Sequence, residues 1–184
     1  NGKFASHYLW NNDELKQVWL RPETGRSRVE LEPTPFDLNQ IDKFFNYNIR
    51  NIRKATFFTN SRINSKSTMS LSDIFTKRAL HNIDLIIDEI TKYPPTIQRA
   101  LYLTLTSSSG QMSSMVFAIT GRGKTKNQVS DKIEVGSWVI GFWRPELHFE
   151  INVWNCFESR AKKLIKALDE INIEKYLVYD SVEP

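Results

Sequence analysis

Two stretches of the sequence concentrate the side chains best suited to contact a polyanion. Residues 43–72 carry six lysines or arginines and no acidic residue, and residues 90–130 carry five and again no acidic residue. The whole chain has a formal net charge of +4, so these two stretches at +11 leave the remaining residues at −7. Lysine and arginine release counterions from phosphates, and the hydroxyls and amides between them can hydrogen-bond phosphates or base edges. The charge pattern fits equally a surface that faces nucleic acid and solvated loops whose cations pair with acids elsewhere in the fold.

One aromatic residue near the second stretch is placed to stack on a base. Trp143 comes after the second basic loop and is followed directly by Arg144. An exposed indole stacks on any base, because every base has a π-face. Large aromatics mostly pack inside proteins, as we expect of Trp138 and Trp154, so core packing is the alternative for Trp143.

Three candidate catalytic features are incomplete. Residues 118–125 end like a phosphate-binding loop, but alanine replaces the first glycine and no helical stripe follows. His148 and Glu150 match the start of a zinc deaminase signature, whose partner cysteines are missing because the chain has a single cysteine. That residue, Cys156, lies on an aromatic helix face and is expected to be buried and inert. We therefore expect no catalytic residue and no metal ligand in this chain.

Length and composition predict one compact domain spanning residues 1–184. The chain is 40% hydrophobic, with 7 glycines and 7 prolines, which is typical of a globular protein. No stretch approaches the roughly 18 apolar residues of a membrane span, and the first residues lack the apolar core of a signal peptide. We therefore expect a cytoplasmic protein with no membrane partner. Because the sequence starts at Asn1 rather than at methionine, we expect a fragment of a longer protein.

Residues 1–72 are expected to form an irregular lead-in with short strands and a basic loop. Strands are predicted at 17–21 and 28–31, followed by a short helix at 37–46 that Asp37 can cap. The helix is predicted to bury four apolar residues, Leu38, Ile41, Phe44 and Phe45. Residues 47–72 show no convincing period and form the basic loop.

Residues 73–184 are expected to contain most of the regular structure. Apolar residues recur every three or four positions over 76–92 and 95–106, and the prolines between them predict a helical hairpin. A strand at 134–143, a third long helix at 152–171 and a terminal strand at 176–179 follow. Helices and strands do not alternate regularly, so the predicted class is α+β, with the helical hairpin and the third helix packed on a small mixed or antiparallel sheet.

Two blocks of sequence carry distinctive combinations of residues. The first is Asp73-Ile74-Phe75-Thr76-Lys77-Arg78-Ala79-Leu80, followed by two helices that run into Thr104-Leu105-Thr106-Ser107-Ser108. The second is residues 136–141, followed by His148-Phe149-Glu150, Asn152-Val153-Trp154, Phe157-Glu158 and Arg160. The order and content of these blocks, over roughly residues 70 to 165, resemble the adenine-specific DNA methyltransferases of restriction-modification systems.

The resemblance implies only part of such an enzyme. The family binds S-adenosylmethionine at a Phe-x-Gly-x-Gly turn and the target adenine at an Asp/Asn-Pro-Pro-Tyr/Phe motif, and this sequence has neither. Its one Pro-Pro pair, Pro94-Pro95, lacks both flanking residues. The blocks match the internal region where a target-recognition insertion belongs. The resemblance thus implies no cofactor in this chain, S-adenosylmethionine for the parent enzyme, and double-stranded DNA and the catalytic methyltransferase domain as partners.

The predicted DNA contacts combine the basic loops with the first block. Arginine can bind guanine through two hydrogen bonds, and asparagine or glutamine can bind adenine in the same way. Lys77 and Arg78 could hold a phosphate at a helix start, although an internal salt bridge is the alternative for Arg78. The predicted contacts are Arg62, Asn64, Lys66, Lys77, Arg78, Arg122, Lys124, Lys126, Asn127, Gln128, Trp143 and Arg144.

The predicted function is DNA binding by a target-recognition-like region without catalytic activity of its own. The alternative is a protein-interaction module that docks onto a methyltransferase or restriction partner, for which we expect an exposed stripe at Ile83, Ile87 and Ile90. A compact nuclease is a third class, and it would require divalent metal binding and a cluster of carboxylates.

Overall fold

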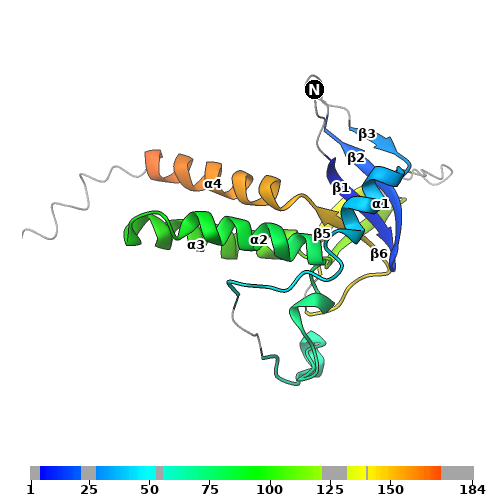
Figure 1. The fold of residues 1–184 in the computed structure, drawn as a ribbon, viewed down its shortest axis with the longest axis horizontal. Coiled ribbons are helices and arrows are strands. Elements are labelled where there is room, and N and C mark those ends of the chain that lie inside the picture. Colours follow the sequence, from blue (N-terminus) through cyan, green and yellow to red (C-terminus); the bar gives the residue numbers. More distant parts are fainter. Residues whose placement is uncertain (1–4, 22–27, 53–55, 122–131, 140, 171–184) are drawn as a thin grey trace, which may run out of the picture.

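The protein combines a six-stranded sheet with a layer of helices (Figure 1). The structure is a computed structural model that describes residues 5–21, 28–52, 56–121, 132–139 and 141–170. The strands are β1 (Ala5–Asn11), β2 (Glu14–Leu20), β3 (Val29–Leu31), β4 (Val116–Thr120), β5 (Ile133–Trp138) and β6 (Leu147–Ile151). The helices are α1 (Pro35–Asp42), α2 (Lys77–Ile90), α3 (Pro95–Met112) and α4 (Val153–Glu170). The α+β prediction is therefore confirmed.

Every pairing in the sheet is antiparallel, in the order β3-β2-β1-β6-β4-β5. The β1–β2 hairpin turns at Asn12, whose φ of +51° suits the left-handed conformation that asparagine tolerates. Leu9, Trp19, Val116 and Phe149 form the core of the sheet, with the Trp19 and Phe149 rings 4.5 Å apart.

The sheet curls until its two edges face each other. Arg28, next to edge strand β3, donates a hydrogen bond from Nη2 to the carbonyl of Ile133 on the opposite edge strand β5. Its Nε donates to Glu30 Oε1 over 2.6 Å. The Arg28 guanidinium therefore links the two edges of the sheet, β3 and β5.

Helices α2, α3 and α4 extend together to one side of the sheet (Figure 1). The Thr76 hydroxyl caps α2 by accepting a hydrogen bond from the Ala79 amide over 3.0 Å, and Pro94 and Pro95 make the predicted turn into α3. Their shared core consists of Ala79, Ile83, Ile86, Ile90, Leu105, Met112, Val153, Cys156 and Phe157. The helical hairpin and the third helix are confirmed.

Helix α3 continues to Met112, beyond the predicted end at residue 106. Its last turns contain hydroxyl residues that donate hydrogen bonds to carbonyls three or four positions earlier. The buried Ser108 hydroxyl, for example, lies 3.0 Å from Thr104 O and 2.9 Å from Leu105 O. The hydroxyl groups find hydrogen-bond acceptors within the helix itself, so this serine-rich segment can remain helical.

Three burial predictions are wrong. Helix α1 begins earlier than predicted, because Thr34 caps it and Asp37 completes the capping box three residues later. None of its residues is fully buried, and Phe45, just beyond it, is 75% exposed. Trp138 and Trp154 are also exposed, Trp154 by 57%. Trp154 lies on the first turn of α4 with its ring centroid 5.9 Å from that of Phe157, but it is not among the buried core residues of this helix, Val153, Cys156 and Phe157.

Candidate nucleic-acid interface

The first basic loop contains a tight turn that presents its polar side chains outward. The amides and carbonyls of Asn60 and Ser65 pair with each other, over 2.9 and 3.0 Å. The Asn60 Oδ1 accepts a hydrogen bond from the Arg62 amide, and Asn64 has a φ of +54°. The Ser65 hydroxyl is buried and donates to Phe58 O. This turn exposes Arg62, Asn64 and Lys66.

The turn packs against the segment that leads into β6. The Phe142 amide donates a hydrogen bond to Ile63 O over 2.7 Å, and the Phe57 and Phe142 rings meet edge to face at 5.4 Å. Gly141 has a φ of +99°, and a Cβ there would lie 2.9 Å from the Ile63 carbonyl oxygen. Glycine is therefore required where the two segments meet. The contact brings residues 63–66 beside residues 142–144.

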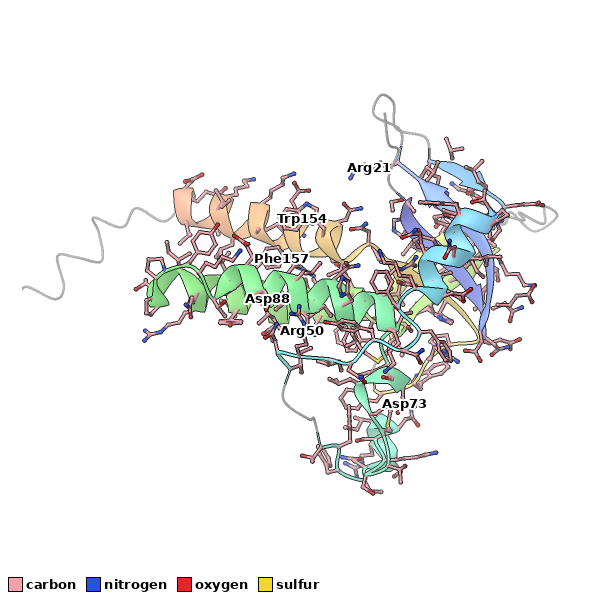
Figure 2. All side chains as sticks on the ribbon, viewed as in Figure 1. Arg21, Arg50, Asp73, Asp88, Trp154 and Phe157 are labelled. Carbon is pink, nitrogen blue, oxygen red and sulfur yellow. The ribbon has the colours of Figure 1, made fainter. Side chains whose placement is uncertain are left out.

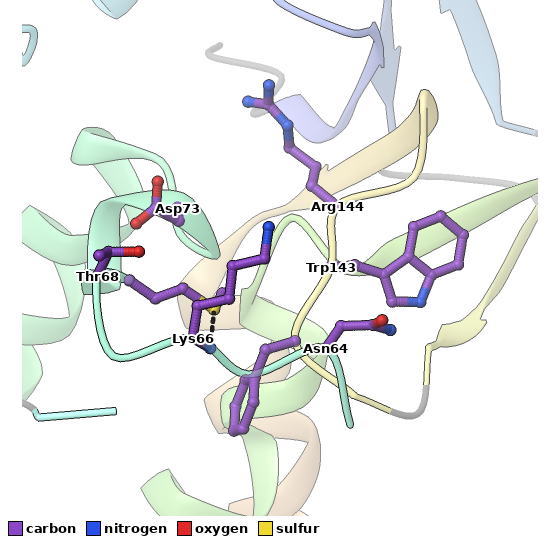
Figure 3. A pocket seen from close by; sticks show the side chains of 8 residues that line it. Asn64, Lys66, Thr68, Asp73, Trp143 and Arg144 are labelled. Carbon is purple, nitrogen blue, oxygen red and sulfur yellow. Dashed lines mark hydrogen bonds between the residues drawn. The ribbon is translucent and has the colours of Figure 1, made fainter. Parts of the chain in front are cut away.

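A groove of about 540 Å³ lies at this junction (Figure 3). Its lining consists of Asn64, Lys66, Thr68, Met69, Asp73, Phe142, Trp143 and Arg144. The structure therefore brings together four of the predicted contacts, Asn64, Lys66, Trp143 and Arg144. Figure 3 shows Lys66 extending between Thr68 and Trp143, and Trp143 is 46% exposed.

The groove carries two cationic side chains and one carboxylate. None of the ion pairs between described residues involves Lys66. The Arg144 guanidinium lies 2.8 Å from Asp13 Oδ1 in the β1–β2 turn. Asp73 accepts hydrogen bonds from the Ser70 amide and hydroxyl, over 2.6 and 2.9 Å. Among the described residues, the groove thus offers Lys66 without an ion-pair partner, Arg144 paired with an exposed acid, the Asn64 amide and an exposed indole.

Arg78 lies outside this groove and does not meet the prediction of a phosphate contact. Its Nε donates to Glu150 Oε1 over 2.9 Å, and its Nη2 lies 2.9 Å from Glu150 Oε2. The two side chains are only 12% and 6% exposed, and the guanidinium stacks 3.8 Å from the Tyr8 ring centroid. Burial opposes the charge, yet the adjacent Glu150 carboxylate raises the pKa of Arg78. The alternative of an internal salt bridge is confirmed, with its partner on β6 rather than in the helical hairpin.

The remaining predicted contacts either do not line the groove or lie outside the described residues. Lys77 is half-buried beside a small apolar pocket that Trp10, Ile41 and Phe45 also line, and Arg62 is exposed on the loop without lining the groove. The second basic loop, with Arg122, Lys124, Lys126, Asn127 and Gln128, lies outside the described residues.

Other cations of the acid-free stretches pair with acids of α2. Arg50 lies 2.7 Å from Asp88, and Lys92 lies 2.6 Å from Glu89. For these two residues the alternative of solvated loops with acidic partners is the correct one. Sequence reasoning also missed Thr68, Met69, Asp73 and Phe142 as groove residues, because only the contact between Ile63 and Phe142 assembles them.

Three of the residues considered for catalysis, His148, Glu150 and Cys156, are buried. Burial raises the pKa of the Cys156 thiol to about 12 and lowers the pKa of His148. The His148 Nδ1 donates to Pro145 O over 2.9 Å. Within the described ranges, no group of three or more histidine, cysteine, aspartate or glutamate side chains is arranged to hold a metal ion.

Comparisons with family models, curated proteins and solved structures return no match for this chain. Among the described residues, none of the helices has the length and apolar character that crossing a membrane requires.

Proposed function

We propose that this protein is a DNA-binding, target-recognition-like region of an adenine-specific DNA methyltransferase, with no catalytic activity of its own. The observation that carries DNA binding is the groove in which Asn64 and Lys66 of one segment meet Trp143 and Arg144 of another. The assignment to a methyltransferase depends on the resemblance of residues 70–165 to that family.

Each groove residue has a distinct task in this proposal. Lys66 and Arg144 neutralise phosphates of double-stranded DNA, which provides most of the affinity. Asn64 is suited to the edge of an adenine, and Trp143 to stacking on a base. The chain needs no cofactor; S-adenosylmethionine is bound by the parent enzyme's catalytic domain, which is the protein partner. A region that acts on DNA in this way belongs in the cytoplasm, without a membrane partner.

The salt dependence of DNA binding tests the proposal. Binding of a fluorescent duplex to the whole chain is measured by anisotropy at increasing salt concentrations. If the groove and the second basic loop neutralise about five phosphates, the log-log slope is about −4 to −5. Lys66→Ala reduces the magnitude of the slope by about 1, because one phosphate contact is lost. Trp143→Ala weakens binding but leaves the slope unchanged, because stacking involves no counterion.

Lys163→Ala is the matched control, since it removes one exposed positive charge from α4, away from the groove. It leaves both affinity and slope near those of the parent chain. A flat salt dependence, or equal effects of Lys66→Ala and Lys163→Ala, would contradict the proposal.

The exposed stripe that we expected for a protein-interaction module is not exposed. Ile83 and Ile90 are buried in the helical core, and Ile87 packs against that core. A partner therefore cannot dock through this stripe while α2, α3 and α4 remain packed together.

A further inference from the structure

A second cleft lies on the inner side of the curled sheet, where β1, β2 and β5 face the end of α3 and the first turns of α4. It encloses about 680 Å³, and small-molecule sites measure roughly 300 to 1,000 Å³. Its polar lining includes His7, Arg21, Arg28, Gln111, Asn155 and Ser159. Among the described residues that line it, two are arginines and none is an aspartate or glutamate. None of the predicted DNA contacts that the structure describes lines this cleft, and it shares no lining residue with the groove at Lys66.

Arg28 is held in place before any ligand arrives. Its guanidinium lies 3.7 Å from the ring centroid of Trp19, which is only 1% exposed. The hydrogen bonds to Glu30 and to Ile133 O fix two of its three nitrogens. The remaining donors of this cation require little ordering when an anion binds, which favours affinity.

Arg21 is the second arginine that lines the cleft. It is exposed at the end of β2, and none of the ion pairs between described residues involves it. Figure 2 shows Arg21 between the sheet and α4. Arg28 is already paired with Glu30 over 2.6 Å, so Arg21 is the arginine of the cleft whose charge a bound anion would balance.

The opposite wall supplies neutral hydrogen-bonding groups at the positive end of a long helix. The Asn152 side chain caps α4 by accepting a hydrogen bond from the Asn155 amide over 3.1 Å. Asn155 and Ser159 are four residues apart, so they lie on one face of α4 and both line the cleft. The start of a helix favours a nearby negative charge.

The remaining lining suits the uncharged part of a ligand. Val135 and Ile151 contribute apolar surface. Burial, reinforced by the positive charges of Arg28 and Arg21, lowers the pKa of His7 from 6.5 to about 4. His7 is therefore neutral at pH 7 and can donate or accept a hydrogen bond without adding a positive charge to the cleft.

We propose that this cleft binds a small organic phosphate of nucleotide size. The phosphate lies between Arg21, Arg28 and the Asn155–Ser159 face of α4, and the organic part lies against Val135 and Ile151. Binding here does not depend on DNA binding at the Lys66 groove.

Calorimetric titration of the whole chain with adenosine 5′-monophosphate tests this inference, with adenosine and inorganic phosphate as comparison probes. We expect saturable binding of the monophosphate and affinity at least about tenfold weaker for either fragment, because each makes only part of the contacts. Arg21→Ala weakens the monophosphate at least about tenfold through loss of a charge-assisted hydrogen bond. Ser159→Glu has the same effect by placing a negative charge on an exposed helix position that lines the cleft.

Lys163→Ala is again the matched control, since it removes an exposed cation from α4 without touching the cleft. Far-ultraviolet circular dichroism confirms that each variant is folded. Absence of saturable binding, equal affinity for adenosine, or equal effects of Arg21→Ala and Lys163→Ala would overturn the inference. A 5′-phosphorylated trinucleotide that displaces the monophosphate identifies a strand terminus as the source of the phosphate, and one that does not identifies a free nucleotide. Lys66→Ala retains monophosphate binding, so failure of either proposal leaves the other intact.

Discussion

At the residue scale, the Arg78–Glu150 pair shows how one contact can join two parts of a fold. Arg78 is on the first turn of α2 and Glu150 is on the central strand β6, so the pair connects the helical layer to the sheet. The ion pair is enclosed, and the Nη2–Oε2 approach of 2.9 Å lacks the alignment of a hydrogen bond, which leaves both atoms without one. A buried pair of this kind is costly to break from one side, because the remaining charge stays in a low-dielectric site.

Glu150→Gln is therefore expected to destabilise the protein strongly. Removing one partner of a buried ion pair costs about 3–5 kcal/mol. The double variant Arg78→Gln/Glu150→Gln should lose less than the sum of the two single changes, because it leaves no isolated charge. Urea denaturation measures the free energy of unfolding of each variant.

Arg50→Gln is a suitable control, because it breaks the exposed pair with Asp88. Its effect on unfolding should be small beside that of Glu150→Gln. If the two variants lost equal stability, the buried pair would not have the structural importance that we assign to it.

Asp13 should affect DNA binding, because it forms an ion pair with Arg144, which lines the groove. Under the proposed function, a DNA phosphate must replace Asp13 as the partner of Arg144. Asp13→Asn removes this competition. Duplex binding should become about two- to fivefold tighter, which is the change in affinity that corresponds to the free energy of an exposed ion pair. Anisotropy titration at low salt measures the change.

The neighbouring Glu14→Gln makes the same change of charge but releases Lys16 instead of Arg144. Equal tightening by both variants would mean that overall charge, rather than release of Arg144, controls binding.

At the element scale, the sequence predicted the helices better than the strands. The stripe of Ala79, Ile83, Ile86 and Ile90 has a clear period, and Thr76 and the two prolines mark its ends. Strands β1 and β6 were missed. In β6 the consecutive residues His148, Phe149 and Glu150 are all buried, because this central strand is covered on both faces. Its polar residues find partners in Pro145 O and Arg78, which no local pattern reveals.

The groove was predictable only in its parts. Charge and residue type pointed to Asn64 and Lys66 in one segment and to Trp143 and Arg144 in another. Their union depends on the hydrogen bond from Phe142 to Ile63 O, a contact between residues far apart in the chain. Sequence pattern likewise could not show that Arg78 would meet the buried carboxylate of Glu150 on β6, a strand that was not predicted.

At the scale of the whole molecule, the proposed DNA groove exists only while the basic loop stays docked beside β6. Gly141→Ala tests this dependence. Alanine at a φ of +99°, with its Cβ 2.9 Å from the Ile63 carbonyl oxygen, must push the two segments apart. We expect a loss of about 1–3 kcal/mol in the free energy of unfolding from backbone strain. Duplex binding should weaken as well, because Trp143 and Lys66 separate.

Ser67→Ala, on the exposed side of the same loop, is the control and should change neither quantity. Loss of stability in Gly141→Ala with unchanged DNA binding would show that the groove does not act as one site.

The guanidinium of Arg28 has a consequence for the mechanics of the protein. In a complete barrel, main-chain hydrogen bonds join the two outermost strands. Here the Arg28 side chain links β3 to β5. Arg28 also lines the cleft that contains Arg21. If a ligand that binds Arg28 in the cleft changes the strength of the contact between β3 and β5, then by thermodynamic reciprocity separating these strands changes the affinity of the cleft by the same factor.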